Sequence, residues 1–284
     1  MSLGIVIKGP EGIVLAAESR VTLSARPTQG PEIHVSFDNA TKLLSFSKPN
    51  STVGVVTYGL AAIGLRTAYS FIPEFEESLT KEKKERLTIQ EFAKHLSEFF
   101  MKQWNSLMPS DYQGPNMTFV VGGFNDGEPY GRVILVDIPQ NPTPVEQHPN
   151  LGDFGITWGG QREFVDRLIQ GYDHGLPEIM ANTLNLTPEQ LETMMEALRP
   201  LQMRLPLMAM PLQDCVDLAI FFVRTTIVAQ RLTVGIRGCG GHVDVAIITR
   251  RKGLQFVQRK HIVGEIGQGV ETPITQGKEL QWEL

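Results

Sequence analysis

The sequence has few cysteines, no long hydrophobic run and no excess of basic residues. Its two cysteines, Cys215 and Cys239, do not have the CxxC spacing of a zinc or redox site. No apolar run approaches the roughly 20 residues that a transmembrane helix needs. Lys8, Glu11 and Glu18 interrupt the N-terminal region, where a secretion signal would carry its apolar segment. These absences favour a cytoplasmic protein with no membrane contact.

The charge balance argues against a nucleic-acid partner. Lys and Arg number 26 against 31 Asp and Glu, which gives a net charge of -5, whereas a nucleic-acid surface needs clustered basic residues. The 6 histidines never fall at metal-ligand spacing. We therefore expect no metal, no cofactor and no nucleic acid.

The remaining composition is that of a folded protein. Hydrophobic residues make up 42% and charged residues 20%, as in ordinary globular chains, and 284 residues are enough to bury a sizeable core. No long linker divides the sequence. We expect a single domain over residues 1–264, followed by a polar tail over residues 265–284.

Hydrophobic periodicity predicts runs of strands alternating with pairs of helices. Thr88 with Glu91, and Thr187 with Gln190, have the spacing of a helix capping box. We expect a long loop over 19–36, strands at 3–7, 13–17, 42–46, 52–58, 117–121, 133–136, 156–158, 243–249 and 254–257, and helices at 61–79, 161–172, 188–198, 212–230 and from residue 88. This order predicts an α+β fold with antiparallel sheets and helices on their outer faces.

Ser2 follows the initiator methionine directly, and a methionine before so small a residue is normally removed. Ser2 would then carry a hydroxyl nucleophile and a free α-amine whose pKa of about 7.7–8.0 suits a general base. Glu18 ends the second strand, and the hairpin returns it beside the start of the first. Lys42 heads a later strand, so the two charges are candidates for an ion pair that tunes the nucleophile. Either could instead be a solvated strand end.

Four segments of the sequence resemble the proteasome subunit family, most closely its β-type chains and their bacterial relatives. The similar stretches are residues 3–20, 41–44, 53–62 and 240–245. The resemblance implies a four-layer αββα sandwich of the N-terminal nucleophile hydrolase type, in which two antiparallel sheets lie between helix layers. It also implies a peptidase that cleaves peptides or unfolded protein inside a ring of its own copies.

Carried over by position, the resemblance implies catalytic roles for Ser2, Glu18 and Lys42. Ser2 stands where the family has threonine, Glu18 where it has aspartate, and Lys42 is unchanged. The resemblance further implies that the backbone N–H groups of Gly59 and Gly159 stabilise an oxyanion. Two later serines of the family are missing, and Cys239 stands in place of one of them.

Two other functions fit the same residues. The chain could be an inactive ring or scaffold subunit that keeps Glu18 and Lys42 as an ordinary ion pair. It could also be an N-terminal nucleophile amidase that acts on a small molecule, which predicts a monomer or small oligomer. A methionine-rich stretch is our candidate for a contact between copies, and its methionines are Met194, Met195, Met203, Met208 and Met210.

Overall fold

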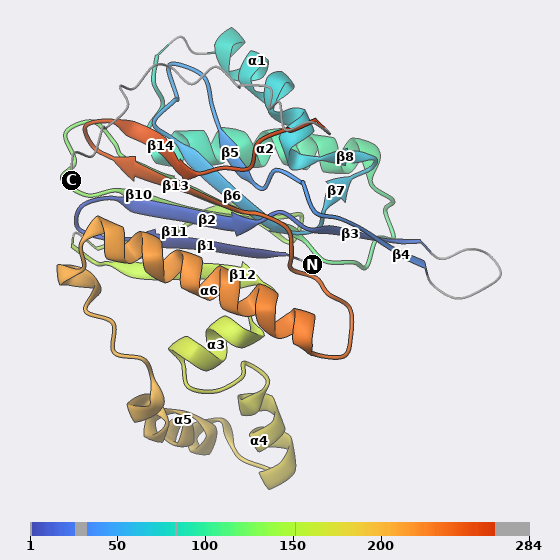
Figure 1. Cartoon of the computed structure of the whole chain (residues 1–284), viewed down its shortest axis with the longest axis vertical. Coiled ribbons are helices and arrows are strands. Elements are labelled where there is room, and N and C mark those ends of the chain that lie inside the picture. The colour runs from blue at the N-terminus through green and yellow to red at the C-terminus, as the bar shows by residue number, and fades with distance from the viewer. Residues whose placement is uncertain (1, 26–32, 83–84, 151, 265–284) are drawn as a thin grey trace.

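The computed structural model of the chain describes residues 2–25, 33–82, 85–150 and 152–264. Most of its strands belong to two five-stranded antiparallel sheets (Figure 1). The first sheet has the order β12-β1-β2-β13-β14, formed by Gly155–Gly160, Leu3–Lys8, Ile13–Glu18, Val243–Thr249 and Gly253–Gln258. The second has the order β11-β10-β9-β6-β5, formed by Asn141–Gln147, Arg132–Ile138, Met117–Gly123, Gly54–Gly59 and Leu43–Ser45.

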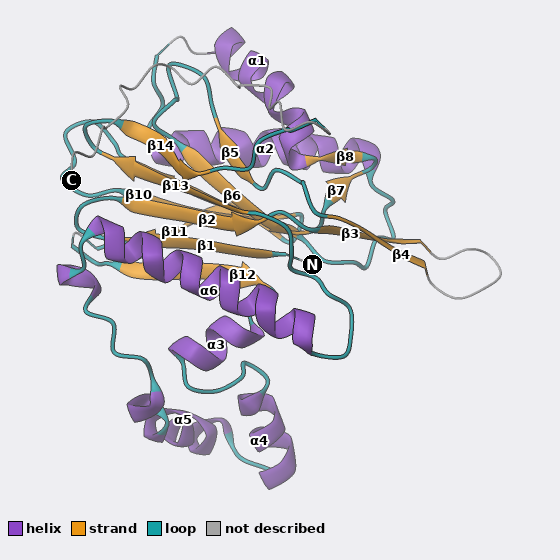
Figure 2. Ribbon diagram, viewed as in Figure 1, coloured by secondary structure: helices purple, strands orange, loops and turns teal. Residues whose placement is uncertain are grey.

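Helices lie on the outer sides of both sheets (Figure 2). Helix α2 (Ile89–Leu107) packs on β9, β10 and β11, and α1 (Ile72–Glu82) packs on α2. Helix α6 (Leu212–Leu232) packs on β1, β2 and β13, with α3 (Glu163–Ile169) against it. Helices α4 (Leu176–Leu184) and α5 (Pro188–Ala197) contact each other and bury none of their residues. The predicted α+β class with antiparallel sheets is confirmed.

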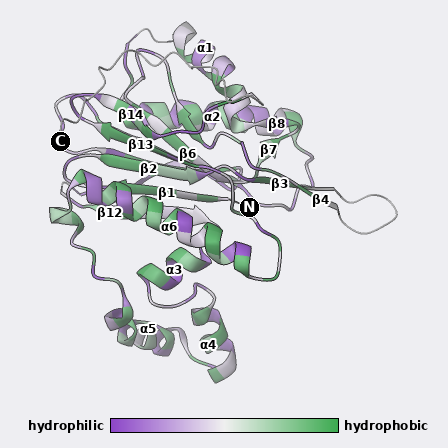
Figure 3. Ribbon diagram, in the orientation of Figure 1, coloured by the Kyte–Doolittle hydropathy of each residue, from purple (hydrophilic) through white to green (hydrophobic). Residues whose placement is uncertain are grey.

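The first hairpin explains why the sheets pack together. Every residue of β1 and β2 is buried, because Leu3, Ile5 and Ile7 face the helices while Val6 faces the second sheet. Such a strand must be apolar on both faces. Figure 3 shows hydrophobic residues along these central strands. The turn between them is closed by a 2.9 Å hydrogen bond from Gly9 N–H to the Gly12 carbonyl.

The predicted helix capping boxes are confirmed. The Thr88 side chain accepts from the Glu91 N–H at the start of α2, and the Thr187 side chain accepts from the Gln190 N–H at the start of α5. In both boxes the third helical residue reaches back to the N-cap backbone, so two donors at each helix start are satisfied.

Several predicted boundaries are wrong. Residues 19–36 are not one loop, because Val21–Ala25 (β3) pairs with Ile33–Phe37 (β4). The helix predicted from residue 61 begins only at residue 72, after the short hairpin β7 (Ala62–Ile63) and β8 (Arg66–Thr67) and the 3-10 turn Ala68–Phe71. Gly64, with φ at +59°, turns the chain there. The helix predicted at 161–172 is only Glu163–Ile169.

Two further elements, helix α4 and strand β11, were absent from the sequence-based expectation. Helix α4 lies in a stretch where Pro177 and its neighbours give a weak helical pattern. Strand β11 contains Pro142 and Pro144, which argue against a central strand; β11 lies at a sheet edge, where proline is tolerated. Two further 3-10 turns, Arg199–Leu201 and Leu207–Ala209, occur in the connection before α6. The predicted polar tail lies outside the described residues.

Candidate active site

Glu18 is a buried carboxylate whose two oxygens are fully engaged. It ends β2 and is 1% exposed. Its Oε1 accepts the Leu3 N–H at 3.2 Å, and its Oε2 accepts the N–H groups of Arg20 at 2.7 Å and Gly240 at 3.1 Å. The hairpin makes the first contact possible because its register sets Gly4 opposite Ala17. A carboxylate with these donors is held in one position.

Lys42 forms a buried ion pair with Glu18. Its side chain is 6% exposed, and its ammonium group donates to Glu18 Oε1 and to the Arg20 carbonyl. An ammonium group has three protons, so two of them are directed at these acceptors. The third proton is left for a group in the pocket, which Lys42 and Ser2 both line.

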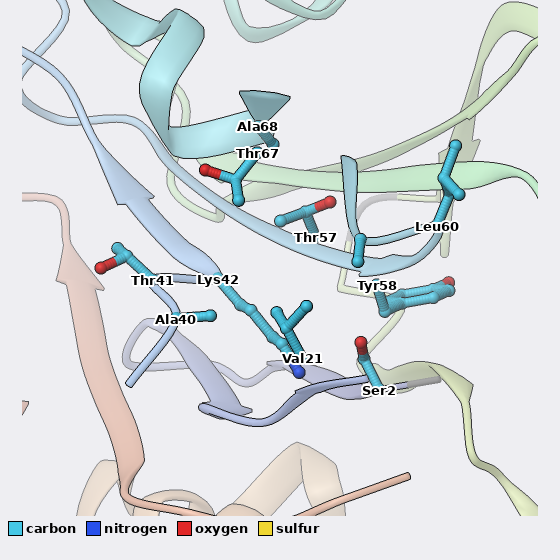
Figure 4. Close-up of a pocket in the computed structure, with 11 residues that line it drawn as sticks. Ser2, Val21, Ala40, Thr41, Lys42, Thr57, Tyr58, Leu60, Thr67 and Ala68 are labelled. Atoms are coloured by element: carbon cyan, nitrogen blue, oxygen red, sulfur yellow. The ribbon is translucent and has the colours of Figure 1, made fainter. Parts of the chain in front are cut away.

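Ser2 lies on the floor of this pocket. It is 3% exposed, and its carbonyl accepts the Gln161 N–H at 2.7 Å. Figure 4 shows its hydroxyl directed into the pocket, with the Lys42 side chain running toward it from the strand above. The structure therefore brings together the three residues predicted to be catalytic: Ser2 directly precedes β1, Glu18 ends β2 and Lys42 directly precedes β5.

The strand registers show that the N–H groups of the two predicted oxyanion donors, Gly59 and Gly159, point in different directions. Leu60 N–H donates to the Asn116 carbonyl at 2.7 Å, in line with the β6–β9 register. Hydrogen-bonded pairs alternate along an antiparallel ladder, so the N–H of Gly59 is directed away from β9. It faces the side of β6 on which Thr57 bonds Lys42. Lys42 and Thr57 both line the pocket beside Ser2, whereas Gly59 lines the neighbouring cleft.

Gly159 is arranged differently. The bond from Gln161 to Ser2 makes the Gly4–Gly159 position a hydrogen-bonded pair of the β1–β12 ladder, so the N–H of Gly159 faces β1. A Cβ atom at Gly159 would lie 2.4 Å from the Tyr58 ring. The register thus favours Gly59 as a donor to the pocket, and the absence of a side chain at Gly159 makes room for Tyr58.

A pair of glutamines links the segments that hold Ser2 and Glu18, and sequence reasoning missed it. Gln230 is 7% exposed. Its Nε2 donates to Gln161 Oε1 at 2.5 Å, and its Oε1 accepts the Cys239 N–H at 2.8 Å. Gln161 in turn holds the Ser2 carbonyl, while the residue after Cys239 donates to Glu18. The sequence did contain a signal for this pair, because Gln230 is a polar residue on the buried face of a helix.

Arg20 forms an ion pair next to Glu18 and Lys42, nearer the surface. Its guanidinium donates to both carboxylate oxygens of Asp38, at 2.6 and 2.8 Å. This hydrogen bonding holds the pKa of Asp38 below its usual value. Because the Arg20 carbonyl also accepts from Lys42, the Arg20–Asp38 pair fixes one of the acceptors that position the ammonium group.

The Cys239 thiol is 2% exposed. Burial is the main cause that raises its pKa, and the nearby charge of Glu18 adds to it. A buried thiol that keeps its proton is a poor nucleophile, so Cys239 has a packing role in the position where the resemblance expected a serine. Among the residues that the structure describes, no group of three or more His, Cys, Asp or Glu side chains is arranged to hold a metal ion.

The pocket beside Ser2 is small and opens next to a larger cleft. It offers about 20 Å³, room for about one water molecule. It shares Leu60 and Ala61 with a neighbouring cleft of about 480 Å³, which runs between Thr22 and Leu23 on one side and Met108 and Tyr112 on the other. The Thr57 hydroxyl lines the small pocket and has no hydrogen-bond partner within the part of the chain that the structure describes.

Comparison with known proteins bears on the fold. No protein-family model matches the chain, and no curated protein sequence is significantly similar to it. Among solved structures, Anbu (ancestral beta-subunit) from Yersinia bercovieri aligns with 91% of this chain and 88% of its own, at a TM-score of 0.54 and 15% identity. The chain has an Anbu-like fold. An Anbu (Gly-1) mutant from Hyphomicrobium sp. strain MC1 aligns with 92% of this chain and 86% of its own, at a TM-score of 0.54 and 12% identity.

These comparisons correct the family assignment made from the sequence. The assignment to the proteasome subunit family is wrong, because no family model matches and the likeness to the two Anbu structures, at 12–15% identity, extends to the fold alone. The similar motifs lie in the buried hairpin β1–β2, at the start of β5, along β6 and at the start of β13, where the fold itself demands apolar residues and glycines. No helix in the described part of the chain is long and apolar enough to cross a membrane.

Proposed function

We propose that the chain is an N-terminal nucleophile hydrolase that cleaves peptide bonds with Ser2. The observation that carries the proposal is the buried Glu18–Lys42 ion pair, whose ammonium group lies in the same pocket as the Ser2 hydroxyl. Two buried charges are costly to maintain. Their position beside a hydroxyl suits a site that tunes a nucleophile.

The reaction begins after Met1 is removed and the α-amine of Ser2 is free. The amine accepts the hydroxyl proton while Oγ attacks the substrate carbonyl. Collapse of the tetrahedral intermediate breaks the C–N bond, and the amine returns the proton to the leaving nitrogen. A water molecule then hydrolyses the acyl ester and regenerates Ser2. Lys42 supplies the positive field that lowers the barrier to deprotonation, and Glu18 keeps Lys42 in place.

The negative oxygen of the intermediate needs a backbone donor. We assign this role to the N–H of Gly59, which the β6–β9 register directs away from β9 and toward the side of β6 on which Lys42 lies. Gly159, the other glycine that the sequence suggested, is a weaker candidate because its N–H faces β1. The peptide would lie in the cleft between β3 and the segment after β6, with a small side chain at the narrow pocket.

The positions of the hydrophobic clusters support a layered arrangement of the sheets and helices. One hydrophobic cluster lies between the two large sheets, and each sheet has one further cluster between it and its helices. We infer a four-layer αββα sandwich of the N-terminal nucleophile type, folded as one domain over residues 1–264. Assembly with other copies is part of this proposal.

The test is the intact mass of the purified protein before and after treatment with a peptide epoxyketone. This probe has two electrophilic carbons, so a stable ring forms only where one residue offers both a hydroxyl and a free amine. We expect loss of Met1 and a single adduct on Ser2. Ser2→Ala should still lose Met1 but gain no adduct, whereas the exposed Ser106→Ala should react like the unaltered protein.

Other outcomes would decide between the alternatives. Retention of Met1 without any adduct contradicts the proposal and leaves an inactive scaffold subunit. An adduct on Ser2 without cleavage of any peptide in a mixed peptide library, but with hydrolysis of small amides, would instead identify a small-molecule amidase.

A further inference from the structure

The Thr57 side chain is buried in the wall of the pocket beside Ser2. It is 6% exposed, and its hydroxyl has no hydrogen-bond partner among the described residues. The backbone around it is fixed, because the Thr57 N–H donates to the Lys42 carbonyl at 2.9 Å and Thr57 pairs with Phe119 in the β6–β9 ladder. Folded proteins rarely leave a buried polar group unsatisfied, because each such group is costly. The hydroxyl is therefore available to a molecule that enters the pocket.

The rest of the pocket wall is largely aliphatic and leaves little room. Its aliphatic side chains are those of Val21, Ala40, Leu60, Ala61 and Ala68. Thr41 and Thr67 also line the pocket, but both residues are only half-buried. The volume of about 20 Å³ holds about one water molecule. The pocket thus suits a very small group, and Thr57 offers that group a buried hydroxyl.

The pocket lies where the side chain next to the reacting carbonyl must go. Figure 4 shows Thr57 across the pocket from Ser2, with the Lys42 side chain along one side. The side chain and the carbonyl carbon of one amino acid are bonded to the same Cα atom. When the Ser2 hydroxyl attacks a carbonyl carbon, the side chain of that same substrate residue is therefore the one beside the pocket. We call it the acyl residue, because it stays on Ser2 as the acyl ester.

We propose that Thr57 makes the enzyme prefer serine as the acyl residue. This inference rests on the function proposed above and adds its substrate preference. The hydroxymethyl group of serine is small, and its hydroxyl can donate to the Thr57 hydroxyl or accept from it. A bound serine side chain thus satisfies two buried hydroxyls with one hydrogen bond.

Other acyl residues match the pocket less well. Alanine fits, but it leaves the Thr57 hydroxyl unpaired, and a neutral hydrogen bond changes an affinity by about 2- to 10-fold. Leucine is larger than the pocket, and a tight pocket discriminates by about 10-fold or more for each extra methylene group. The expected order is therefore serine first, alanine second and leucine last.

The test compares peptides that differ only in the acyl residue. The probes are N-acetylated tripeptide aminocoumarin amides that end in serine, alanine or leucine, and the readout is kcat/KM. We expect the serine peptide to be cleaved about 10-fold better than the alanine peptide. Thr57→Val keeps the shape of the side chain and removes its hydroxyl, so this preference should disappear. Thr193→Val, an exposed change on α5, is the matched control and should keep the preference.

Equilibrium binding to Ser2→Ala separates this inference from the proposed chemistry, because that variant has no hydroxyl with which to attack the peptides. The serine peptide should bind Ser2→Ala about 10-fold more tightly than the alanine peptide, and the difference should vanish when Thr57→Val is added. Circular dichroism checks that each variant is folded.

The outcomes distinguish the two proposals. Equal binding of the two peptides to Ser2→Ala, or a serine preference that persists in Thr57→Val, would overturn the role of Thr57, even where the epoxyketone adduct on Ser2 supports the hydrolase. A serine preference in binding that depends on Thr57, without any adduct on Ser2, would support the pocket preference and overturn the hydrolase.

Discussion

A Cβ atom at Gly160 would lie 1.7 Å from the carbonyl oxygen of Ser2. No side chain fits at that distance, and Gly160 also has φ at +88°. Gly160 and the residue after it serve one purpose: Gly160 lets the backbone approach Ser2, and Gln161 then donates its N–H to the same oxygen. The position of the proposed nucleophile therefore depends on a glycine 158 residues away in the sequence.

Gly160→Ala should displace Ser2 and abolish the epoxyketone reaction. Gly152→Ala is the matched control, because Gly152 also has positive φ, at +77°, but no atom of the described residues other than its chain neighbours lies within 4 Å of its Cβ position. We expect Gly152→Ala to lower the free energy of unfolding by about 1–2 kcal/mol and Gly160→Ala to lower it more. Urea unfolding measures both, and equal effects would contradict the close contact with Ser2.

Glu18→Gln should destabilise the protein by about 3–5 kcal/mol, because it leaves the Lys42 ammonium buried without a countercharge. Adding Lys42→Met to Glu18→Gln should recover part of that loss, since the unpaired charge is then gone. Glu98→Gln breaks an exposed ion pair instead and should cost less than about 1 kcal/mol. The measurement is the free energy of unfolding in urea. Additive effects of the two buried changes would show that the pair is not coupled.

Thr57→Val should not destabilise the protein, because the buried Thr57 hydroxyl has no hydrogen-bond partner among the described residues and an unpartnered hydroxyl is costly to bury. We expect a gain of up to about 1 kcal/mol in the free energy of unfolding. Thr118→Val is the control, because the Thr118 hydroxyl donates to Asp137 at 2.6 Å; it should lose about 1.5–3 kcal/mol. Thermal unfolding distinguishes them, and a loss at Thr57 similar to that at Thr118 would reveal a partner for its hydroxyl.

The Arg20–Asp38 pair should make stability depend on acid pH. Hydrogen bonding to Arg20 lowers the pKa of Asp38 in the folded protein, so the folded state binds its proton less readily than the unfolded chain. The resulting stabilisation is present above pH about 4 and is lost as pH falls through the folded pKa.

Asp38→Asn should accordingly reduce stability at pH 5–7 and have a diminishing effect below pH about 4. Because the Asp38 side chain is 45% exposed, the effect should stay below about 1 kcal/mol. Urea unfolding at a series of pH values measures it. In an Arg20→Leu background the pH-dependent difference should disappear, and its persistence would assign the effect to another group.

Local sequence pattern is sufficient wherever a residue's neighbours in the chain decide its conformation. Short apolar runs between turn residues predict β1, β2 and β13, and the capping boxes at Thr88 and Thr187 predict where α2 and α5 begin. The tight turn between β1 and β2 likewise predicts that Glu18 lies beside the start of β1. These features depend on contacts over a few residues or across one tight turn.

Pattern fails where distant contacts outweigh local preference. Residues 19–36 are rich in Ser, Thr, Pro and Gly, which are typical of loops, yet Val21–Ala25 pairs with Ile33–Phe37. Likewise, the apolar residues after Ala61 suggest a helix, but Gly64 turns the chain into a hairpin before Ile72–Glu82 becomes helical.

The sequence by itself determined the class of the fold and three residues of the candidate site, because Ser2, Glu18 and Lys42 lie at or near the ends of strands whose apolar pattern is strong. Only the tertiary structure decided how these residues are held. The Gln230–Gln161 bond joins residues 69 positions apart, the Gly160 contact with Ser2 spans more than half of the chain, and the direction of the Gly59 N–H depends on strand register. Register and such distant contacts follow from how the sheets and helices pack together, and no local periodicity encodes them.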